Sequence, residues 1–208
     1  MADTYADSYE LMKNRKYESE FSMRMKKGNS GIIYFSPHGG GIESGASELA
    51  EFSADPQDSY YAFEGRLGSG NSVLHVTSTH FNEPNAVNLV HQHRIAVSYH
   101  GYSDSAVKNT KIGGLDVQLR NFVSEEFTAA GIPWEMEPAG SDIAGAEPGN
   151  IVNETTRGMG IQLEISTMQR NAFFSTNTAA GRRTSRLPEF DNYIAAVKRG
   201  VAKLVATL

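Results

Sequence analysis

The stretch GIIYFSPHGGGIE, residues 31–43, decides the fold of this chain. Its first half, Gly31–Ser36, is a short apolar run rich in β-branched and aromatic residues, which predicts a buried strand. Its second half is a turn in which three consecutive glycines follow Pro37 and His38 and precede Glu43. In open α/β sheets, ligands bind beyond the carboxyl ends of the strands, where such turns lie. The stretch therefore predicts a sheet with a functional loop at the end of one strand.

The rest of the chain alternates between strand-like and helix-like runs, which favours an α/β sandwich. We expect further strands over Tyr60–Gly65, Val73–Ser78, Arg94–Tyr99 and Gly160–Ser166, and helices over Asp7–Asn14, Ser44–Ala54, Pro84–His93, Leu115–Ala130 and Leu187–Leu208. The chain has 208 residues and no repeat or low-complexity linker, so we expect one domain over residues 1–208.

Composition argues against several classes of function. The absence of cysteine excludes disulfides, thiolate metal sites and a cysteine nucleophile. A net charge of -5 argues against nucleic-acid binding. No run approaches the ~20 apolar residues of a membrane helix, so we expect no membrane partner. The polar first twenty residues lack the apolar core of a signal peptide, which predicts a cytoplasmic protein or one released on cell lysis.

Two more polar residues fall where apolar strands would place them near the glycine turn. His100 follows the predicted strand Arg94–Tyr99, and Glu164 lies inside the apolar segment GIQLEIS. Two imidazoles, a carboxylate and a water form a common catalytic zinc site, and a free carboxylate nearby serves as general base. A histidine after a strand can equally cap or pack, a strand Glu can face solvent, and a glycine turn can bind phosphate. From the residues alone, both readings of His38, Glu43 and His100 stay open.

Four segments together resemble the phage-type poly-γ-glutamate hydrolases, a family also found in bacterial genomes, often within prophages. The segments are SPHGGGIE (36–43), STHFNEPNA (78–86), SYHGY (98–102) and GIQLEIS (160–166), in the family's order. The resemblance implies the fold of zinc carboxypeptidases, a single-domain three-layer α/β/α sandwich with a mixed, mostly parallel central sheet. It also implies one catalytic zinc ion and cleavage of γ-glutamyl amide bonds within poly-γ-glutamate, a polyanion of bacterial capsules.

The resemblance implies a role for each of the four site residues. His38, Glu43 and His100 would hold the zinc ion, and Glu164 would be the general base that takes a proton from the attacking water. Four residues separate His38 from Glu43 here, whereas two separate the first ligand pair of carboxypeptidases. This departure fits the phage-type family and argues against an ordinary carboxypeptidase.

Asn150 and Arg157 are candidates for holding a carboxylate of the substrate. Carboxypeptidases use Asn and Arg upstream of the base in this way, since Arg can bind a carboxylate with two parallel hydrogen bonds. Family members often have another basic residue near Asn153, where this chain has Glu154. A polar surface loop is therefore the alternative for this segment.

His80 and Tyr102 are weaker candidates for the lining of the site. His80 follows a predicted strand and could orient a ligand, or it could cap the helix that begins at Pro84. Tyr102 follows the His100 segment and could line the pocket or simply pack. The basic run 181–186 could attract a polyanion or form a solvated loop.

We expect a monomeric zinc hydrolase that acts on poly-γ-glutamate, and two alternatives remain. One is a different zinc amidase or carboxypeptidase, acting on peptidoglycan γ-linkages or on acylated amino acids. The other is an inactive prophage-derived protein that binds a carboxylated ligand without turning it over.

Overall fold

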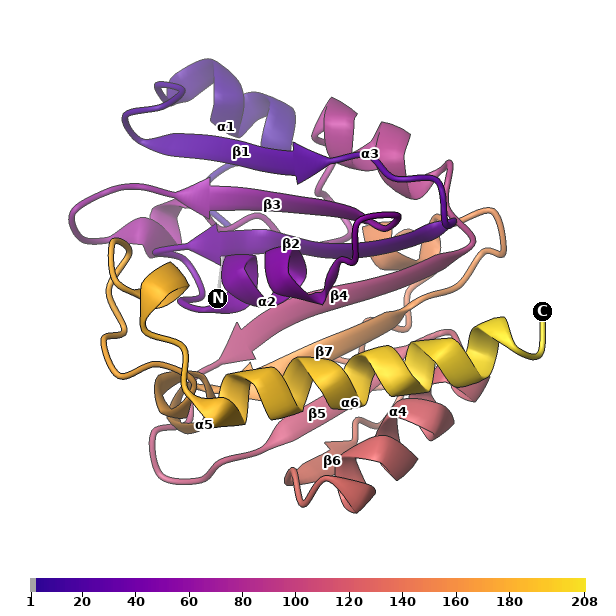
Figure 1. Cartoon of the computed structure of the whole chain (residues 1–208). Coiled ribbons are helices and arrows are strands. Elements are labelled where there is room, and N and C mark those ends of the chain that lie inside the picture. The colour runs from indigo at the N-terminus through magenta and orange to yellow at the C-terminus, as the bar shows by residue number, and fades with distance from the viewer. Residues whose placement is uncertain (1–2) are drawn as a thin grey trace.

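A seven-stranded mixed sheet runs through the middle of the protein (Figure 1). The computed structural model describes residues 3–208. The strands lie in the order β1-β3-β2-β4-β7-β5-β6 and comprise β1 Phe21–Lys26, β2 Ile32–Gly40, β3 Ser59–Gly65, β4 Ile95–Tyr102, β5 Thr110–Gly114, β6 Trp134–Met136 and β7 Ile161–Ser166. Four neighbouring pairs are parallel, and the pairs β1–β3 and β5–β7 are antiparallel. The predicted mixed, mostly parallel sheet is confirmed.

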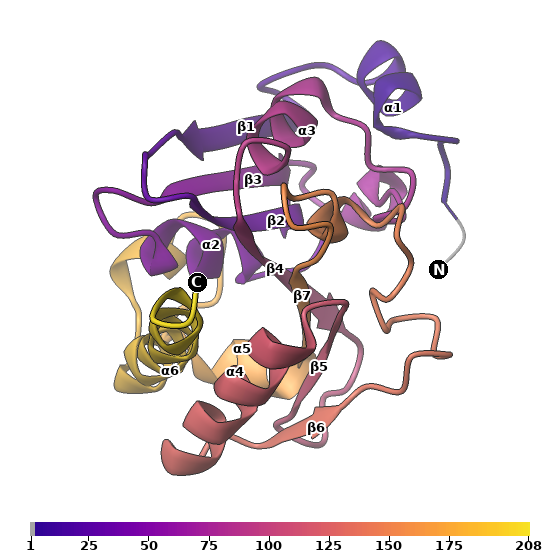
Figure 2. The ribbon, with the colours of Figure 1, turned by 90° about the vertical axis from the view of Figure 1, so that its right-hand side faces the viewer.

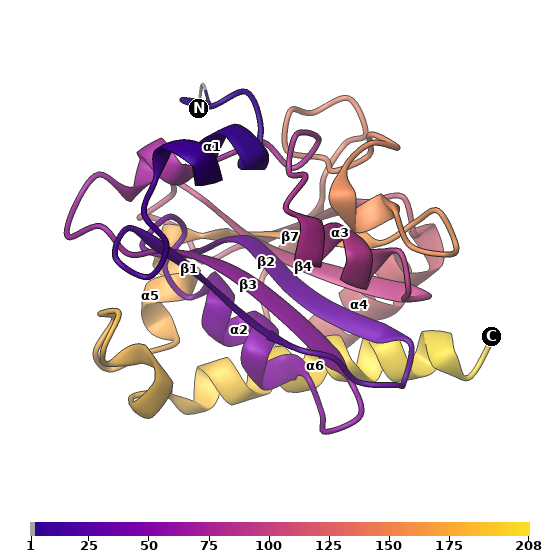
Figure 3. The same ribbon diagram turned by 90° about the horizontal axis from the view of Figure 1, so that it is seen from above.

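Helices cover both faces of the sheet, as Figures 2 and 3 show. The bounds are α1 Ser8–Asn14, α2 Ala46–Ser53, α3 Pro84–Val90, α4 Val117–Ala129, α5 Thr167–Ala172 and α6 Pro188–Val205. Helices α1 and α3 pack on one face, and α2, α4 and α6 pack on the other. The predicted three-layer α/β/α sandwich is therefore confirmed.

The central strands are apolar on both faces because each face carries its own core. In β2, Ile33 and Phe35 point into the core under α1 and α3, whereas Tyr34 points into the core under α2, α4 and α6. Successive side chains of a strand point to opposite faces, so a strand that is covered on both sides has a continuous apolar sequence. This explains why GIIYFS contains no polar residue before Ser36.

The predicted strand Val73–Ser78 is wrong. A 3₁₀ turn, Asn71–Leu74, occupies its first half, and residues 75–77 have no regular secondary structure and join no ladder of the sheet. The segment nevertheless buries alternate side chains, since Leu74 and Val76 are both 1% exposed. The carbonyl oxygen of Val76 contacts the ring nitrogen Nε2 of His38 at 2.7 Å instead of pairing with another strand.

Within residues 3–208, no helix is both long enough and apolar enough to cross a membrane. The other predicted helices and strands agree with the structure to within a few residues at their ends, and β2 extends beyond its predicted end at Ser36 as far as Gly40. The sequence patterns did not predict β1, β5, β6 or α5.

Candidate metal centre and active site

Three adjacent parallel strands end at the same edge of the sheet and bring His38, His100 and Glu164 together. These are β2, β4 and β7, which are hydrogen-bonded neighbours. The register of β4 against β7 places His100 directly opposite Glu164. Paired residues of neighbouring strands project to the same face, so the two side chains share one side of the sheet.

The glycine turn brings Glu43 back over His38. The backbone N–H of Glu43 donates to the carbonyl oxygen of His38 at 2.8 Å, which closes the turn. Gly39 must lack a side chain, because a Cβ there would lie 2.0 Å from Ser47 Oγ and 2.9 Å from the carbonyl oxygen of Phe63. Gly40 has a φ of +66°, in the left-handed region that favours glycine.

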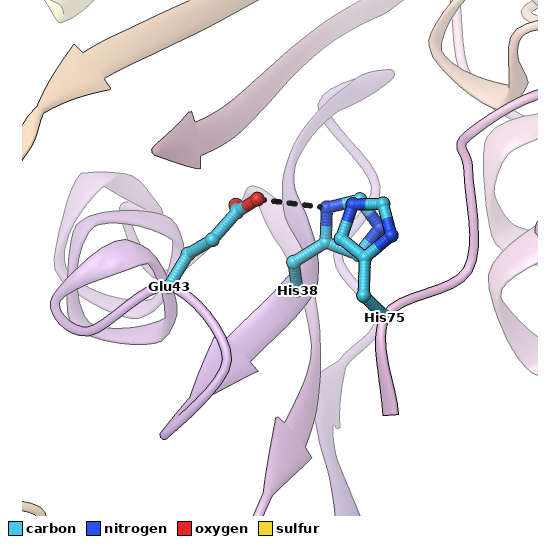
Figure 4. Close-up of side chains that lie close together, drawn as sticks. All are labelled: His38, Glu43 and His75. Atoms are coloured by element: carbon cyan, nitrogen blue, oxygen red, sulfur yellow. Dashed lines mark ion pairs between the residues drawn. The ribbon is translucent and has the colours of Figure 1, made fainter. Parts of the chain in front are cut away.

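Two imidazole nitrogens and the two oxygens of one carboxylate converge at this edge. His38 Nδ1 lies 3.2 Å from Glu43 Oε1 and 3.1 Å from His100 Nδ1. His100 Nδ1 lies 3.7 Å from Glu43 Oε2. Ligand atoms arranged tetrahedrally around one zinc ion, at 2.0–2.2 Å, are about 3.4 Å apart. The separations here therefore match those around a single zinc ion, and Figure 4 shows the Glu43 carboxylate directed at the His38 ring.

The hydrogen bonds around these side chains direct the donor atoms inward. The ring nitrogen Nε2 of His38 lies 2.7 Å from the Val76 carbonyl oxygen, to which it donates, so the lone pair of its neutral ring is on Nδ1. Glu43 Oε2 accepts the backbone N–H of Gly101 at 2.9 Å, which leaves Oε1 facing His38. One imidazole and one carboxylate are held in this way, and together with His100 Nδ1, 3.1 Å from His38 Nδ1, they fit a zinc ion.

The electrostatics of the cluster also favour a cation between these residues. Burial alone would lower the pKa of His38, but the Glu43 carboxylate, with the Val76 carbonyl and Asp3, raises that pKa above its ordinary value. Burial alone would raise the pKa of Glu43, but His38 and then His100 hold it below its ordinary value. Burial lowers the pKa of His100 to about 3, so His100 is neutral, as a ligand must be.

Glu164 is a buried carboxyl group beside the cluster. Its Oε1 lies 4.0 Å from His100 Nδ1 and accepts a hydrogen bond from Gln162 Nε2 at 2.9 Å. Asn150 Nδ2 in turn donates to Gln162 Oε1 at 3.0 Å, so a chain of side chains fixes the orientation of Glu164. Burial, and then the Glu43 carboxylate, raise the pKa of Glu164 well above its ordinary range. A raised pKa suits a group that must accept a proton and later return it.

A cavity of about 750 Å³ opens over these residues. His38, Glu43, His100 and Glu164 lie in its wall, together with Asn150, Gln162 and Tyr102. The irregular segment 139–147 borders the cavity, and Arg170 also reaches it. A pocket with a few convergent polar groups and perturbed carboxyl and imidazole groups has the properties of an active site.

The structure brings together some of the residues that the sequence suggested and leaves others outside. Asn150 and Tyr102 line the cavity, but His80 and Arg157 do not. The His80 side chain is 59% exposed. Arg157 Nη1 instead pairs with Asp116 Oδ2 at 2.6 Å.

The sequence patterns did not identify His75, which also lines the cavity. Its ring lies against that of His38, with centroids 4.0 Å apart, and the two rings overlap in the view of Figure 4. His75, His38 and Glu43 have possible ligand atoms that all lie within 4.8 Å of one another. The His75 Nδ1 atom is 3.0 Å from an oxygen of Asp3, whose other oxygen accepts the Thr77 N–H at 2.8 Å. Because these long-range contacts place the His75 side chain, spacing along the chain gave no signal for it.

Similar proteins are known in phage and in Bacillus. The chain is 39% identical over 198 residues to the SPbeta prophage-derived UPF0714 protein YoqZ of Bacillus subtilis (strain 168), a match that covers 95% of this chain and 71% of YoqZ. It is 37% identical over 197 residues to the UPF0714 protein YmaC of the same strain, covering 94% of this chain and 83% of YmaC.

Two solved structures resemble this one over nearly the whole chain. A bacteriophage poly-γ-glutamate hydrolase is 40% identical, covers 100% of both chains and superimposes with a TM-score of 0.95. The apo, zinc-free form of YndL is 34% identical, covers 98% of this chain and 99% of its own, and gives a TM-score of 0.91. The family model for poly-γ-glutamate hydrolases matches residues 5–196. The chain belongs to the poly-γ-glutamate hydrolase family.

Proposed function

We propose that this protein is a zinc-dependent hydrolase that cleaves the γ-glutamyl amide bonds of poly-γ-glutamate. His38, Glu43 and His100 hold the zinc ion, and Glu164 is the general base. The observation that carries the proposal is the convergence of His38 Nδ1, His100 Nδ1 and the Glu43 carboxylate, with contacts of 3.1, 3.2 and 3.7 Å between them, beside a buried carboxyl group in one cavity. The similarity to a bacteriophage poly-γ-glutamate hydrolase supports the substrate, and the zinc-free form described for YndL supports the metal.

His100 is a better third ligand than His75. The Nδ1 atom of His100 lies 3.1 Å from that of His38. His75 Nδ1 instead contacts Asp3, and its ring is tilted by only 33° from the plane of the His38 ring. Because the His75 ring lies against the His38 ring, its lone pair does not point to the place where His38 Nδ1 meets Glu43 and His100. We therefore assign His75 to the wall of the substrate cavity.

The residues of the site divide the chemistry between them. Zinc, when bound, polarises the scissile carbonyl and lowers the pKa of water. Glu164 lies within reach of the same point and takes the proton of the attacking water, then passes it to the leaving amine. Gln162 holds the Glu164 carboxylate in one orientation through the hydrogen bond to Oε1. No covalent intermediate with the protein is needed.

The cavity wall supplies candidates for substrate contacts. Each residue of poly-γ-glutamate carries a free carboxylate, so the substrate needs hydrogen-bond donors along its path. Of the residues suggested by the sequence, we retain Asn150 and Tyr102 for this role, because both line the cavity.

The test is an assay of polymer length with and without metal. Purified protein is incubated with poly-γ-glutamate in the presence of zinc, after treatment with a chelator, and after zinc is restored, and the polymer is followed by gel filtration. We expect shortening with zinc, none after chelation, and recovery on restoration. An unchanged polymer would contradict the proposed substrate. Cleavage of acylated amino acids or of peptidoglycan γ-linkages in that case would identify a different zinc amidase, and binding of zinc without any cleavage would identify a ligand-binding protein.

A further inference from the structure

Arg170, on the short helix α5, connects three separate segments of the site. Its guanidinium group donates from Nε to the carbonyl oxygen of Ile165 at 3.0 Å and from Nη1 to that of Ser44 at 3.1 Å. It also donates from Nη2 to the carbonyl oxygen of Tyr102 at 3.4 Å. Only 8% of the residue is exposed, so these contacts are shielded from water.

Each of the three acceptor residues lies within two positions of a proposed zinc ligand or of the proposed general base. Ser44 follows Glu43, Ile165 follows Glu164, and Tyr102 lies two residues after His100. One planar side chain therefore links the glycine turn, the end of β4 and the end of β7. The contact with the glycine turn is a long-range one, since Ser44 and Arg170 are separated by 126 positions in the sequence.

The hydrogen bonds of Arg170 leave it little capacity to bind a substrate. A guanidinium group has five N–H donors. Three of them donate to the carbonyl oxygens, and Nη2 donates also to Thr167 Oγ1 at 3.3 Å. One N–H, on Nη1, is left, whereas two parallel bonds are needed to hold a carboxylate in a fork.

The backbone beside Arg170 is shaped for the guanidinium group. A Cβ atom on Gly101 would lie 2.5 Å from Arg170 Nε and Cζ and 2.8 Å from Nη2. Gly101 also donates its N–H to Glu43 Oε2 at 2.9 Å. The guanidinium group thus packs directly against the residue that follows His100, on the side where Glu43 is anchored.

We propose that Arg170 is a positioning residue that fixes the spacing of Glu43, His100 and Glu164 through the three backbone carbonyls, and so prepares the site for zinc. The inference rests on the proposed zinc site. Groups that orient metal ligands typically account for about 10- to 100-fold in metal affinity. Loss of the three-way contact should therefore weaken zinc binding by about that factor without removing a ligand.

The test compares Arg170→Lys with a matched control, Arg120→Lys. Lysine keeps the charge but cannot reach three carbonyls with a planar fork. Arg120, on α4, also donates to two backbone carbonyls, those of Gly114 and Glu137 at 3.3 and 3.4 Å, and lies outside the cavity wall. Zinc affinity is measured by competition with a chromophoric chelator, and thermal unfolding of the metal-free proteins is measured alongside.

We expect Arg170→Lys to bind zinc about 10- to 100-fold more weakly than the unaltered protein, and Arg120→Lys to lose stability with unchanged zinc affinity. Equal zinc affinity of Arg170→Lys and the unaltered protein would overturn the inference. If, in that case, Arg170→Met binds zinc weakly, the charge of residue 170 and not its contacts with the three carbonyls is what matters. Failure of the unaltered protein to bind zinc would instead contradict the proposed function.

A second variant serves if Arg170→Lys does not fold. Gly101→Ala keeps Arg170 and the N–H that anchors Glu43, but its methyl group displaces the guanidinium. It should also weaken zinc binding. A Gly101→Ala protein that binds zinc as tightly as the unaltered one would refute the positioning role.

Discussion

His100 and Glu164 stand opposite each other on the parallel strands β4 and β7, with His100 Nδ1 4.0 Å from Glu164 Oε1. The backbone register of the sheet therefore sets the distance between a proposed metal ligand and the proposed base. Burial lowers the pKa of His100 to about 3 and raises the pKa of Glu164 well above its ordinary range. Both shifts have the same main cause, which is that burial opposes the charged form of each group.

Replacing Glu164 with Gln tests the proton-transfer role. The amide keeps the size of the side chain but cannot accept a proton, so turnover should fall by about 10²- to 10⁴-fold. Zinc content should stay near one per protein, because Glu164 is not among the proposed ligands. Elemental analysis and the polymer assay are run on the same preparation. Turnover equal to that of the unaltered protein would remove Glu164 from the mechanism.

Alanine substitutions at the three histidines of the cavity wall decide the ligand set. His38→Ala and His100→Ala should purify with little or no zinc, since each removes one of three ligands. His75→Ala should retain zinc and show its effect in turnover or in KM instead. Zinc bound by His100→Ala but lost from His75→Ala would assign the third ligand position to His75.

Gly39→Ala tests the glycine turn. The added methyl group would collide with Ser47 Oγ and with the carbonyl oxygen of Phe63, and such overpacking typically costs about 1–3 kcal/mol of stability. The strain lies beside His38, so zinc content should fall as well. Gly68→Ala is the control, because a Cβ there meets nothing within 4 Å. Its free energy of unfolding in urea should change by no more than about 0.5 kcal/mol, and an equal loss in both variants would contradict the steric account.

Substitutions at Asn150 and Arg157 should have different effects, the first on activity and the second on stability. Asn150→Ala leaves Gln162 Oε1 without its donor, so Gln162 can turn and Glu164 loses its fixed orientation. A hydrogen bond of this kind corresponds to about a tenfold fall in kcat. Arg157→Met removes the partner of the buried Asp116 carboxylate and should lower the melting temperature with kcat unchanged. A fall in kcat for Arg157→Met, and none for Asn150→Ala, would restore Arg157 to the substrate site.

The sequence predicts the parts of the site that lie at the ends of strongly apolar strands. The positions of His38, Glu43, His100 and Glu164 follow from local patterns, because each adjoins or lies within a buried run. His75 and Arg170 do not follow from such patterns. His75 is held by Asp3, 72 positions away, and Arg170 lies on a helix of six residues, too short to show a periodicity.

The missed strands have physical causes of their own. β5, with the sequence TKIGG, ends in two glycines and is held by its pairing with β6 and β7, which no local pattern reveals. β6 has only three residues. β1, FSMRMK, does alternate apolar and polar residues, so its signal was present and could have been used. The segment after Leu74 shows the opposite error, an alternation that buries side chains without a partner strand.

The backbone ladder that joins β2, β4 and β7 has a consequence for how this protein can change over time. Hydrogen bonds between main-chain atoms, which are the same whatever the side chains, hold the end of β4 against β7 and the end of β2 against β3. Substitutions in the outer helices α4 and α6 can therefore accumulate, each altering stability slightly, while the reactive groups keep their distances. Enzymes built in this way can diverge widely in sequence and still conserve their chemistry, and the superposition at a TM-score of 0.95 with only 40% identity is consistent with such drift.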